Sequence, residues 1–230
     1  MKREGEKIVG VVVYDYQLAR IVDRAGVDIV SVGDSVGVNI WGHAVEEDVT
    51  LDEMLVVCRA VHRGATHALV SCDVPGGVRD VVDAARALVH DGGAAAVKVD
   101  ADPATIHAIV EAGVPVWAQL GTEPTGLTTE DAVRRAEALE QAGASMLDFR
   151  HSGPVAGPAV VRAVSIPVIG GLGGGPWLDG RVRAVANAIG YSTASLDDQA
   201  DRYANVAQVG FEAITAYTAD VRAGRQIRGK

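Results

Sequence analysis

Short apolar runs that alternate with longer amphipathic segments are the feature that most constrains how this chain can fold. The apolar runs are rich in β-branched residues and have the length of buried strands. Between them apolar residues recur at helical spacing, and several of these segments close on glycine, where a helix C-cap is expected. The eight candidate strands are residues 7–14, 27–34, 67–75, 94–100, 114–121, 145–150, 166–173 and, with the weakest pattern, 184–192.

Strict alternation of strands and helices predicts parallel strands joined by crossover helices. Eight strands in 230 residues predict an α/β fold of the (β/α)8 TIM-barrel type, with a doubly wound open sheet as the alternative. We expect one domain over residues 1–230, extended at its C-terminus by a long helix or helix pair within 196–224 that packs between subunits. The expected crossover helices are residues 17–26, 51–64, 78–93, 103–113 and 128–143.

Charge and composition narrow the class of partner. The formal net charge is −9 and no Lys/Arg cluster interrupts it, so we expect no nucleic acid partner. No segment approaches 18 consecutive apolar residues, and the charged N-terminus lacks a following apolar stretch, so we expect neither membrane insertion nor secretion. The two cysteines, Cys58 and Cys72, have no metal-ligand spacing, which is typical of a reduced cytoplasmic protein.

Three successive strands are predicted to finish on aspartate: Asp34, Asp73 and Asp100. In a barrel of this type the carboxyl ends of the strands converge on one mouth, where active sites lie. Three carboxylates brought together repel one another unless a cation neutralises them, and oxygen ligands favour Mg²⁺. The alternative for each aspartate is a cap on the helix that follows it. The sequence therefore predicts a magnesium site at the barrel mouth.

Lys98 lies two residues before Asp100 and is expected to point the same way on a strand. A buried ammonium there would suit a carboxylate or enolate oxygen of a substrate, whereas the alternative is a lysine along the barrel rim. The glycine-rich run 169–175 follows the seventh candidate strand, where such barrels often bind phosphate. It does not match the dinucleotide fingerprint, and we interpret it as tight turns.

Several stretches, in order and over nearly the whole chain, resemble the ketopantoate hydroxymethyltransferase family of the phosphoenolpyruvate mutase/isocitrate lyase superfamily. The most specific is the block "YDY…AGVD…VGDS", and it is followed by "GHAVEEDVTLDEMLVVCRAVHRGA", "ALVSCDVP", "AVKVD", "AGVPVWAQLG" and "SIPVIGGLGGG". The resemblance implies a Mg²⁺-dependent (β/α)8 barrel in a large homo-oligomer. It also implies condensation of a small-molecule 2-oxo acid with a one-carbon unit from 5,10-methylenetetrahydrofolate.

The resemblance also implies roles for individual residues. Asp34 and Asp73 correspond to direct metal ligands, and Ser35, Asp73 and Lys98 to residues that hold the oxo acid. Asp100 stands where the family has a glutamate near the metal, and its side chain, one methylene shorter, would act through a water molecule.

This chain departs from the family pattern at the end of its sixth strand. The family has a glutamate there that accepts a proton, and the corresponding residue here is Arg150, which cannot accept one. The usual histidine of the fifth-strand motif is replaced by Gln119, and the chain is shorter after 120–126 and after 72–77. We expect both shortenings to uncover the barrel mouth.

On a strand, Asp148 and Arg150 face one side, and Phe149 and His151 face the other. Facing inward, Arg150 would suit a second carboxylate or a phosphoryl group of the substrate, with Asp148 as the replacement base or as its fixed ionic partner. The alternatives are a structural Asp–Arg pair and a loop arginine facing water. His151 would be the base if the strand ended one residue early, and we interpret His43 as a hydrogen-bonding loop residue.

Three functional hypotheses follow. The first is a Mg²⁺-dependent 2-oxo acid enzyme in which Lys98, Asp148 and Arg150 take part in catalysis. It would make or break the carbon–carbon bond next to the oxo acid, by hydroxymethyl transfer, aldol or lyase chemistry on a more anionic substrate. The second is an enzyme that acts on a phosphonate or a phosphorylated oxo acid. The third is a non-catalytic paralogue, which the retained Asp34, Asp73 and Lys98 argue against.

Overall fold

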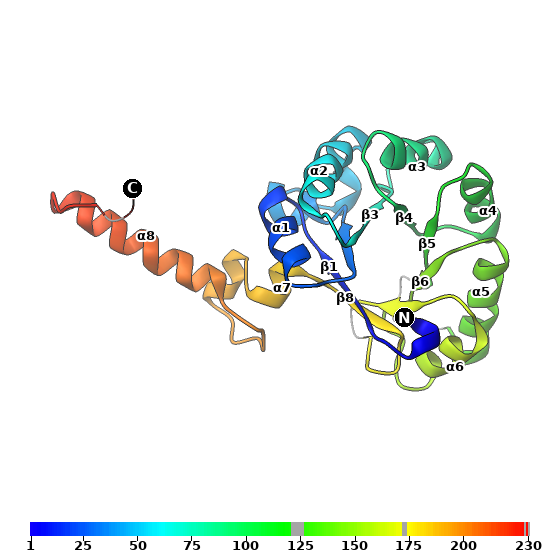
Figure 1. Cartoon of the computed structure of the whole chain (residues 1–230). Helices are drawn as coiled ribbons and strands as arrows, with labels where there is room; N and C mark the ends of the chain where they lie inside the picture. Colours follow the sequence, from blue (N-terminus) through cyan, green and yellow to red (C-terminus); the bar gives the residue numbers. More distant parts are fainter. Residues whose placement is uncertain (121–126, 172–173, 228, 230) are drawn as a thin grey trace. The chain divides into compact units, whose positions relative to one another are not determined.

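The computed structural model describes residues 1–120, 127–171, 174–227 and 229 and shows a closed barrel of eight parallel strands in the order β1 to β8 (Figure 1). This confirms the (β/α)8 TIM barrel and excludes the open sheet. Neighbouring strands pair in parallel register, for example Asp73 beside Lys98 and Gln119 beside Asp148. The strands are β1 (Ile8–Val12), β2 (Ile29–Val32), β3 (Leu69–Asp73), β4 (Ala96–Val99), β5 (Val116–Gln119), β6 (Met146–Asp148), β7 (Val168–Gly170) and β8 (Gly180–Ala184).

Helices form the outer ring around these strands (Figure 1). Most of them begin where the sequence places a capping side chain. The Thr50 side chain accepts from the Glu53 backbone N–H while Glu53 reaches back to Thr50, which is a complete capping box. The helices of the ring are α1 (Tyr16–Arg24), α2 (Leu51–Gly64), α3 (Val81–His90), α4 (Pro103–Glu111), α5 (Thr129–Gln141) and α6 (Ala156–Ala163).

The barrel interior changes from apolar to charged along the strands. Ile8, Ile29, Trp117, Met146, Ile169 and Val182 form one buried cluster. Ser71 Oγ donates a hydrogen bond to Ser31 Oγ across 2.9 Å, and both side chains are fully buried. Two residues further along β3 comes Asp73, the first of the charged groups at the carboxyl ends of the strands. The apolar cluster fills the barrel below a polar mouth.

The eighth strand lies earlier than the sequence pattern predicted. Residues 184–192 were expected to form it, but β8 is Gly180–Ala184 and Val185–Ile189 is a short helix, α7. Gly180 explains the placement, because a Cβ there would lie 2.2 Å from the backbone oxygen of Ile8 in β1. Only glycine lets β8 approach β1 this closely. Helix α6 was not anticipated either, since Gly157 and Pro158 interrupt its apolar pattern.

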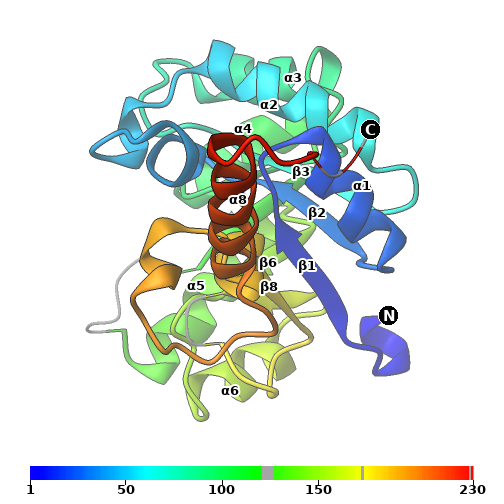
Figure 2. The ribbon, with the colours of Figure 1, turned by 90° about the vertical axis from the view of Figure 1, so that its left-hand side faces the viewer.

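The chain divides into two compact units, Met1–Arg183 and Ala184–Lys230. In the second unit the helix expected within 196–224 begins only at Val206 and continues to Arg222 as a single helix, α8 (Figure 2). Asn205 caps it by accepting from the Gln208 backbone N–H. None of its residues is buried. Its exposed large apolar side chains are Val206, Val209, Phe211, Ile214, Tyr217 and Val221.

Two further features of the structure concern membrane-spanning helices and the two cysteines. Across the described ranges, no helix combines the length and the hydrophobicity that crossing a bilayer requires. Cys58 and Cys72 are both buried free thiols.

Candidate active site

Charged side chains from four strand ends gather at the mouth of the barrel. Asp73 is the last residue of β3, Lys98 lies within β4 and Asp148 is the last residue of β6. Their exposed fractions are only 4, 4 and 1%. Asp34 follows β2 by two residues, Arg150 follows β6 by two, and both are partly buried. The barrel therefore brings together five of the side chains that the sequence singled out.

Asp73 and Lys98 form a buried ion pair. Lys98 Nζ lies 3.0 Å from Asp73 Oδ1, although within the described residues this oxygen accepts no well-directed hydrogen bond. Burial raises the pKa of Asp73 to about 6; the Lys98 charge opposes the shift and the carboxylate of Asp34 adds to it. Burial is also the main cause of the raised pKa of Asp34. Two desolvated carboxylates near each other favour an additional cation between them.

Asp148 is buried and is held by Arg150. Arg150 Nε donates a hydrogen bond to Asp148 Oδ2 across 3.1 Å, so the two side chains face the same side, as expected. Asp148 Oδ1 is also buried but has no hydrogen-bond partner among the residues that the structure describes. The Arg150 side chain is 26% exposed. Its positive charge partly opposes the rise in the pKa of both Asp34 and Asp73 that burial causes. Arg150 is thus a positive group of the shared mouth and does not project as a loop residue into water.

Asp100 is not part of this cluster. Its side chain is 38% exposed, and Oδ1 lies 3.4 Å from a terminal guanidinium nitrogen of Arg135 in α5. The sequence analysis expected Asp100 to point to the same side as Lys98, as alternate residues of a strand do. However, β4 ends at Val99, so Asp100 lies outside the strand. Outside the gaps at 121–126, 172–173, 228 and 230, no three His, Cys, Asp or Glu side chains are arranged to hold a metal ion. Of the three aspartates expected to meet, the structure brings Asp34 and Asp73 together at the mouth and places Asp100 apart from them.

Ser35 is joined to two residues that the sequence analysis did not select. Its Oγ lies 3.0 Å from the hydroxyl of Tyr14, and Asn39 Nδ2 donates to that hydroxyl across 3.1 Å. Tyr14 follows β1 and is buried, which raises the pKa of its phenol. The available signal was the position of Tyr14 at the end of the first apolar run, but a tyrosine there also fits the core.

The other candidate residues lie around the cluster. Gln119, nearly buried, ends β5 beside Asp148. His43 lies against Gly37, where a Cβ would come within 2.9 Å of its Nδ1, and this buried nitrogen has no hydrogen-bond partner among the described residues. His151 is exposed and is the one non-glycine residue with positive φ in the described chain, at 52°. Residues 121–126, and 172–173 of the glycine-rich run, lie outside the described residues.

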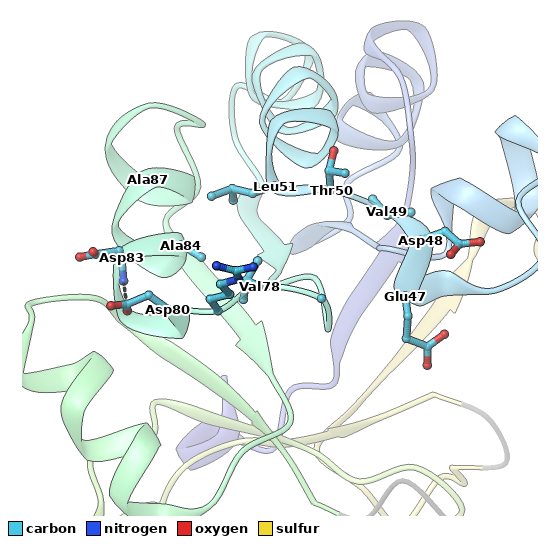
Figure 3. Close-up of a pocket in the computed structure, with 12 residues that line it drawn as sticks. Glu47, Asp48, Val49, Thr50, Leu51, Val78, Asp80, Asp83, Ala84 and Ala87 are labelled. Atoms are coloured by element: carbon cyan, nitrogen blue, oxygen red, sulfur yellow. Dashed lines mark hydrogen bonds between the residues drawn. The ribbon is translucent and has the colours of Figure 1, made fainter.

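A separate pocket of ≈ 600 Å³ lies between the start of α2 and α3 (Figure 3). None of the five charged residues of the mouth lines it. Its charged lining is mainly acidic, with one arginine, Arg79, so it is poorly suited to an anionic ligand. The acidic lining residues are Glu47, Asp48, Asp80 and Asp83.

Comparison with known proteins decides the family. The sequence matches the model of the ketopantoate hydroxymethyltransferase family over residues 1–226. The chain belongs to this family. The 3-methyl-2-oxobutanoate hydroxymethyltransferase of Geobacillus kaustophilus is 35% identical, over 96% of this chain and 87% of the relative. The enzyme of the same name from Magnetococcus marinus is 37% identical, over 96% of this chain and 91% of the relative. The chain is therefore a ketopantoate hydroxymethyltransferase-like enzyme.

Solved structures confirm the fold class. A crystal structure of 2,3-dimethylmalate lyase, a PEP mutase/isocitrate lyase superfamily member, matches with a TM-score of 0.69 at 18% identity, covering 85% of this chain and 81% of that one. Phosphonopyruvate hydrolase in complex with oxalate and Mg²⁺ matches with a TM-score of 0.66 at 17% identity, covering 97% of this chain and 85% of that one. At these identities the likeness concerns the fold.

Proposed function

We propose that this protein is a Mg²⁺-dependent 2-oxo acid enzyme that makes or breaks the carbon–carbon bond next to the oxo acid, on a substrate with a second anionic group. The proposal rests on the position and the contacts of Arg150. Among the described residues it is bound only by Asp148, through Nε, which leaves its terminal nitrogens for a ligand at the mouth. A planar guanidinium is well suited to a carboxylate or a phosphoryl group.

The residues present fit a magnesium ion held by two carboxylates. Asp73 is a buried carboxylate that Lys98 contacts through Oδ1 at 3.0 Å, and Asp34 lies near enough to raise its pKa. Mg²⁺ is commonly bound by one or two carboxylates together with substrate oxygens and water. Asp34 and Asp73 would hold it, and when bound it would stabilise negative charge that develops on the oxo oxygen. The structural neighbour with oxalate and Mg²⁺ supports the same choice of ion.

Charge at the mouth supports an anionic substrate. Asp34, Asp73 and Asp148 oppose Lys98 and Arg150, which leaves one net negative charge. A bound divalent cation would turn this into one net positive charge. Such a site favours an anionic ligand over a neutral one. Lys98 and Ser35 would contact the 2-oxo carboxylate, and Arg150 the second anionic group.

Asp148 is the residue best placed to accept a proton in place of the family's glutamate. Arg150 is a permanent cation and cannot do so. The buried Oδ1 of Asp148 is not engaged by any described residue, so it is available to a substrate hydroxyl or to the carbon next to the oxo group. In the direction of hydroxymethyl transfer the one-carbon donor would be 5,10-methylenetetrahydrofolate, as in the family reaction; cleavage would need no such donor.

A second candidate function rests on the same arginine. The guanidinium of Arg150 also suits a phosphoryl group, so the substrate could be a phosphonate or a phosphorylated oxo acid, as in the neighbouring phosphonopyruvate hydrolase. The two candidate functions predict different products. Action on a phosphonate or a phosphorylated oxo acid would release free phosphate, whereas carbon–carbon bond chemistry would give a smaller or larger carbon skeleton. A non-catalytic paralogue would show neither.

The protein is further proposed to work as a large homo-oligomer. Helix α8 carries six large exposed apolar side chains over 17 residues and buries none of them within the unit Ala184–Lys230. A helix with this composition is stabilised mainly by packing against another surface.

The deciding experiment is a screen of 2-oxo acids for Mg²⁺-dependent proton–deuterium exchange at the carbon next to the oxo group, followed by product analysis. We expect exchange or cleavage with dicarboxylic 2-oxo acids and its loss in Asp73→Ala. Arg150→Met should weaken binding of a dicarboxylic 2-oxo acid about 10–100-fold, with a much smaller effect on 3-methyl-2-oxobutanoate. Absence of any Mg²⁺-dependent binding or exchange, or full binding by Asp73→Ala, would overturn the proposal.

A further inference from the structure

Three residues from consecutive parts of the chain share a hydrogen-bonded arrangement beside the candidate site. Tyr14 follows β1, Ser35 follows β2, and Asn39 lies in the π-helical turn Gly37–Trp41. The Tyr14 hydroxyl is 3.0 Å from Ser35 Oγ. Asn39 Nδ2 donates to the Tyr14 hydroxyl across 3.1 Å and to the Ser35 backbone oxygen across 2.9 Å.

These contacts define the donor of both Asn39 hydrogen bonds and favour one direction for the Tyr14–Ser35 hydrogen bond. A backbone carbonyl oxygen only accepts, so the Asn39 amide must present its nitrogen to Ser35, and the same nitrogen then donates to Tyr14. The Tyr14 oxygen therefore accepts from Asn39, and of the two possible donors between Tyr14 and Ser35 the Tyr14 hydroxyl is the favoured one. The opposite direction would leave the buried Tyr14 hydrogen without an acceptor in the described part of the chain, which is costly.

This arrangement determines what the Ser35 hydroxyl can bind. Because its oxygen accepts from Tyr14, the hydroxyl hydrogen of Ser35 remains for another partner. The Ser35 oxygen also lies on the Asp73 side of the mouth. A Cβ built on Gly33 would be 2.8 Å from Ser35 Oγ and 3.8 Å from Asp73 Oδ2, so both oxygens flank the same glycine.

We propose that Tyr14 and Asn39 are positioning residues that hold the Ser35 hydroxyl as a hydrogen-bond donor to a carboxylate oxygen of the bound 2-oxo acid. The inference rests on the proposed function of this site. Neither residue needs to touch the substrate, since each acts through Ser35. Removing the Tyr14 hydroxyl lets the Ser35 hydrogen turn toward other acceptors and should weaken binding by about 3–10-fold.

The test is calorimetric binding of oxalate, a planar mimic of a 2-oxo carboxylate, to the full chain with saturating Mg²⁺. Tyr14→Phe and, as a second variant, Asn39→Ala should each weaken oxalate binding about 3–10-fold, with melting temperatures close to that of the wild type. The matched control is Tyr16→Phe, two residues away and exposed, which should bind as the wild type does.

A double-mutant cycle separates positioning from a merely structural role. In a Ser35→Ala background, Tyr14→Phe should cause no further loss of oxalate affinity, because the hydroxyl through which it acts is gone. An equal loss with and without Ser35, or unchanged affinity of Tyr14→Phe and Asn39→Ala, would overturn this inference and leave the proposed function intact. A wild-type chain that binds no oxalate with Mg²⁺ would overturn both.

Discussion

Arg150 donates a hydrogen bond from Nε to Oδ2 of Asp148 across 3.1 Å, at the strand end where a proton-accepting glutamate was expected from the family pattern. The exposed fraction of the Asp148 side chain is 1%, and the cations near it are this guanidinium and Lys98. A buried carboxylate that loses its partner keeps the cost of desolvation without the compensating attraction.

We therefore expect Arg150→Met to lower the free energy of unfolding by about 2–3 kcal/mol, somewhat below the usual cost for a fully buried pair because Arg150 is partly exposed. The double variant Asp148→Asn/Arg150→Met should recover most of this loss, since it removes the unpaired charge as well. Urea unfolding of the four proteins in the cycle measures the coupling. Arg181→Met, at an exposed position of β8, is the control and should change little. Additive losses would contradict the pairing.

A second prediction concerns pH. Asp23 in α1 is buried and accepts hydrogen bonds from the backbone N–H groups of His67 and Ala68, from the Thr66 hydroxyl and from the His67 ring. Burial alone would raise the pKa of Asp23, but these bonds outweigh it and hold the pKa well below its ordinary value of 3.8. Asp23 thus anchors the loop between α2 and β3 to α1.

A carboxyl whose pKa is lowered by folding stabilises the native state above its unfolded pKa, and this stability is lost as the pH falls through the folded value. Asp23→Asn should therefore lower the unfolding free energy by about 2–4 kcal/mol at pH 7, and the gap to the wild type should narrow as the pH falls below about 4. Thermal unfolding between pH 2 and 7 measures it. Glu111→Gln, which removes a carboxylate at an exposed helix end, is the control. A gap that widens in acid would contradict the assignment.

Closure of the barrel gives a third prediction. Gly180→Ala places a methyl group 2.2 Å from the Ile8 backbone oxygen and should destabilise the barrel by about 3 kcal/mol or more, because β1 and β8 must separate. Gly76→Ala, at an exposed turn where a Cβ would come no closer than 3.7 Å to Glu47 Cγ, is the control and should change the stability by less than about 0.5 kcal/mol. Calorimetry of both variants, at one protein concentration, tests the difference. Equal effects would contradict the close approach of β8 to β1.

The exposed face of α8 gives a fourth prediction. Ile214→Glu combined with Val221→Glu places two charges on the stripe that also contains Val206 and Tyr217. If this stripe packs between subunits, the pair should reduce the sedimentation coefficient to that of a smaller species, while the far-ultraviolet circular dichroism of the barrel stays unchanged. Glu212→Gln, on the same helix, is the control. A variant that sediments as the wild type does would show that the stripe is not an interface.

The order of strands and helices could be predicted from the sequence because each element has its own local hydrophobic pattern. A strand buried on both faces is a short β-branched run, and a helix over the sheet shows a period of 3.6 residues. Runs 7–14, 67–75 and 114–121 contain β1, β3 and β5. The prediction was wrong at 184–192, where the position of β8 depends on contact with β1 across the closed barrel, a contact that no local pattern reports.

The site was partly predictable for the same reason. Asp73, Lys98 and Asp148 are fixed by the two-residue alternation inside strands, so their inward direction follows once the strands are known. Asp100 lies just past the end of β4, and there the alternation no longer applies; its pairing with Arg135 depends on how the strand ends. Tyr14 and Asn39 lie 25 positions apart and meet only because β1 and β2 are neighbours.

The sequence by itself determined that this chain is a (β/α)8 barrel with acidic and basic groups at its strand ends, since hydrophobic periodicity and residue order are written along the chain. Only the tertiary structure decided which of those groups share the mouth: Arg150 turns onto Asp148, Ser35 is joined by Tyr14 and Asn39, and Asp100 turns away. The physical reason is that contacts across a closed barrel depend on where each strand stops and on which strands become neighbours, and both are settled by packing.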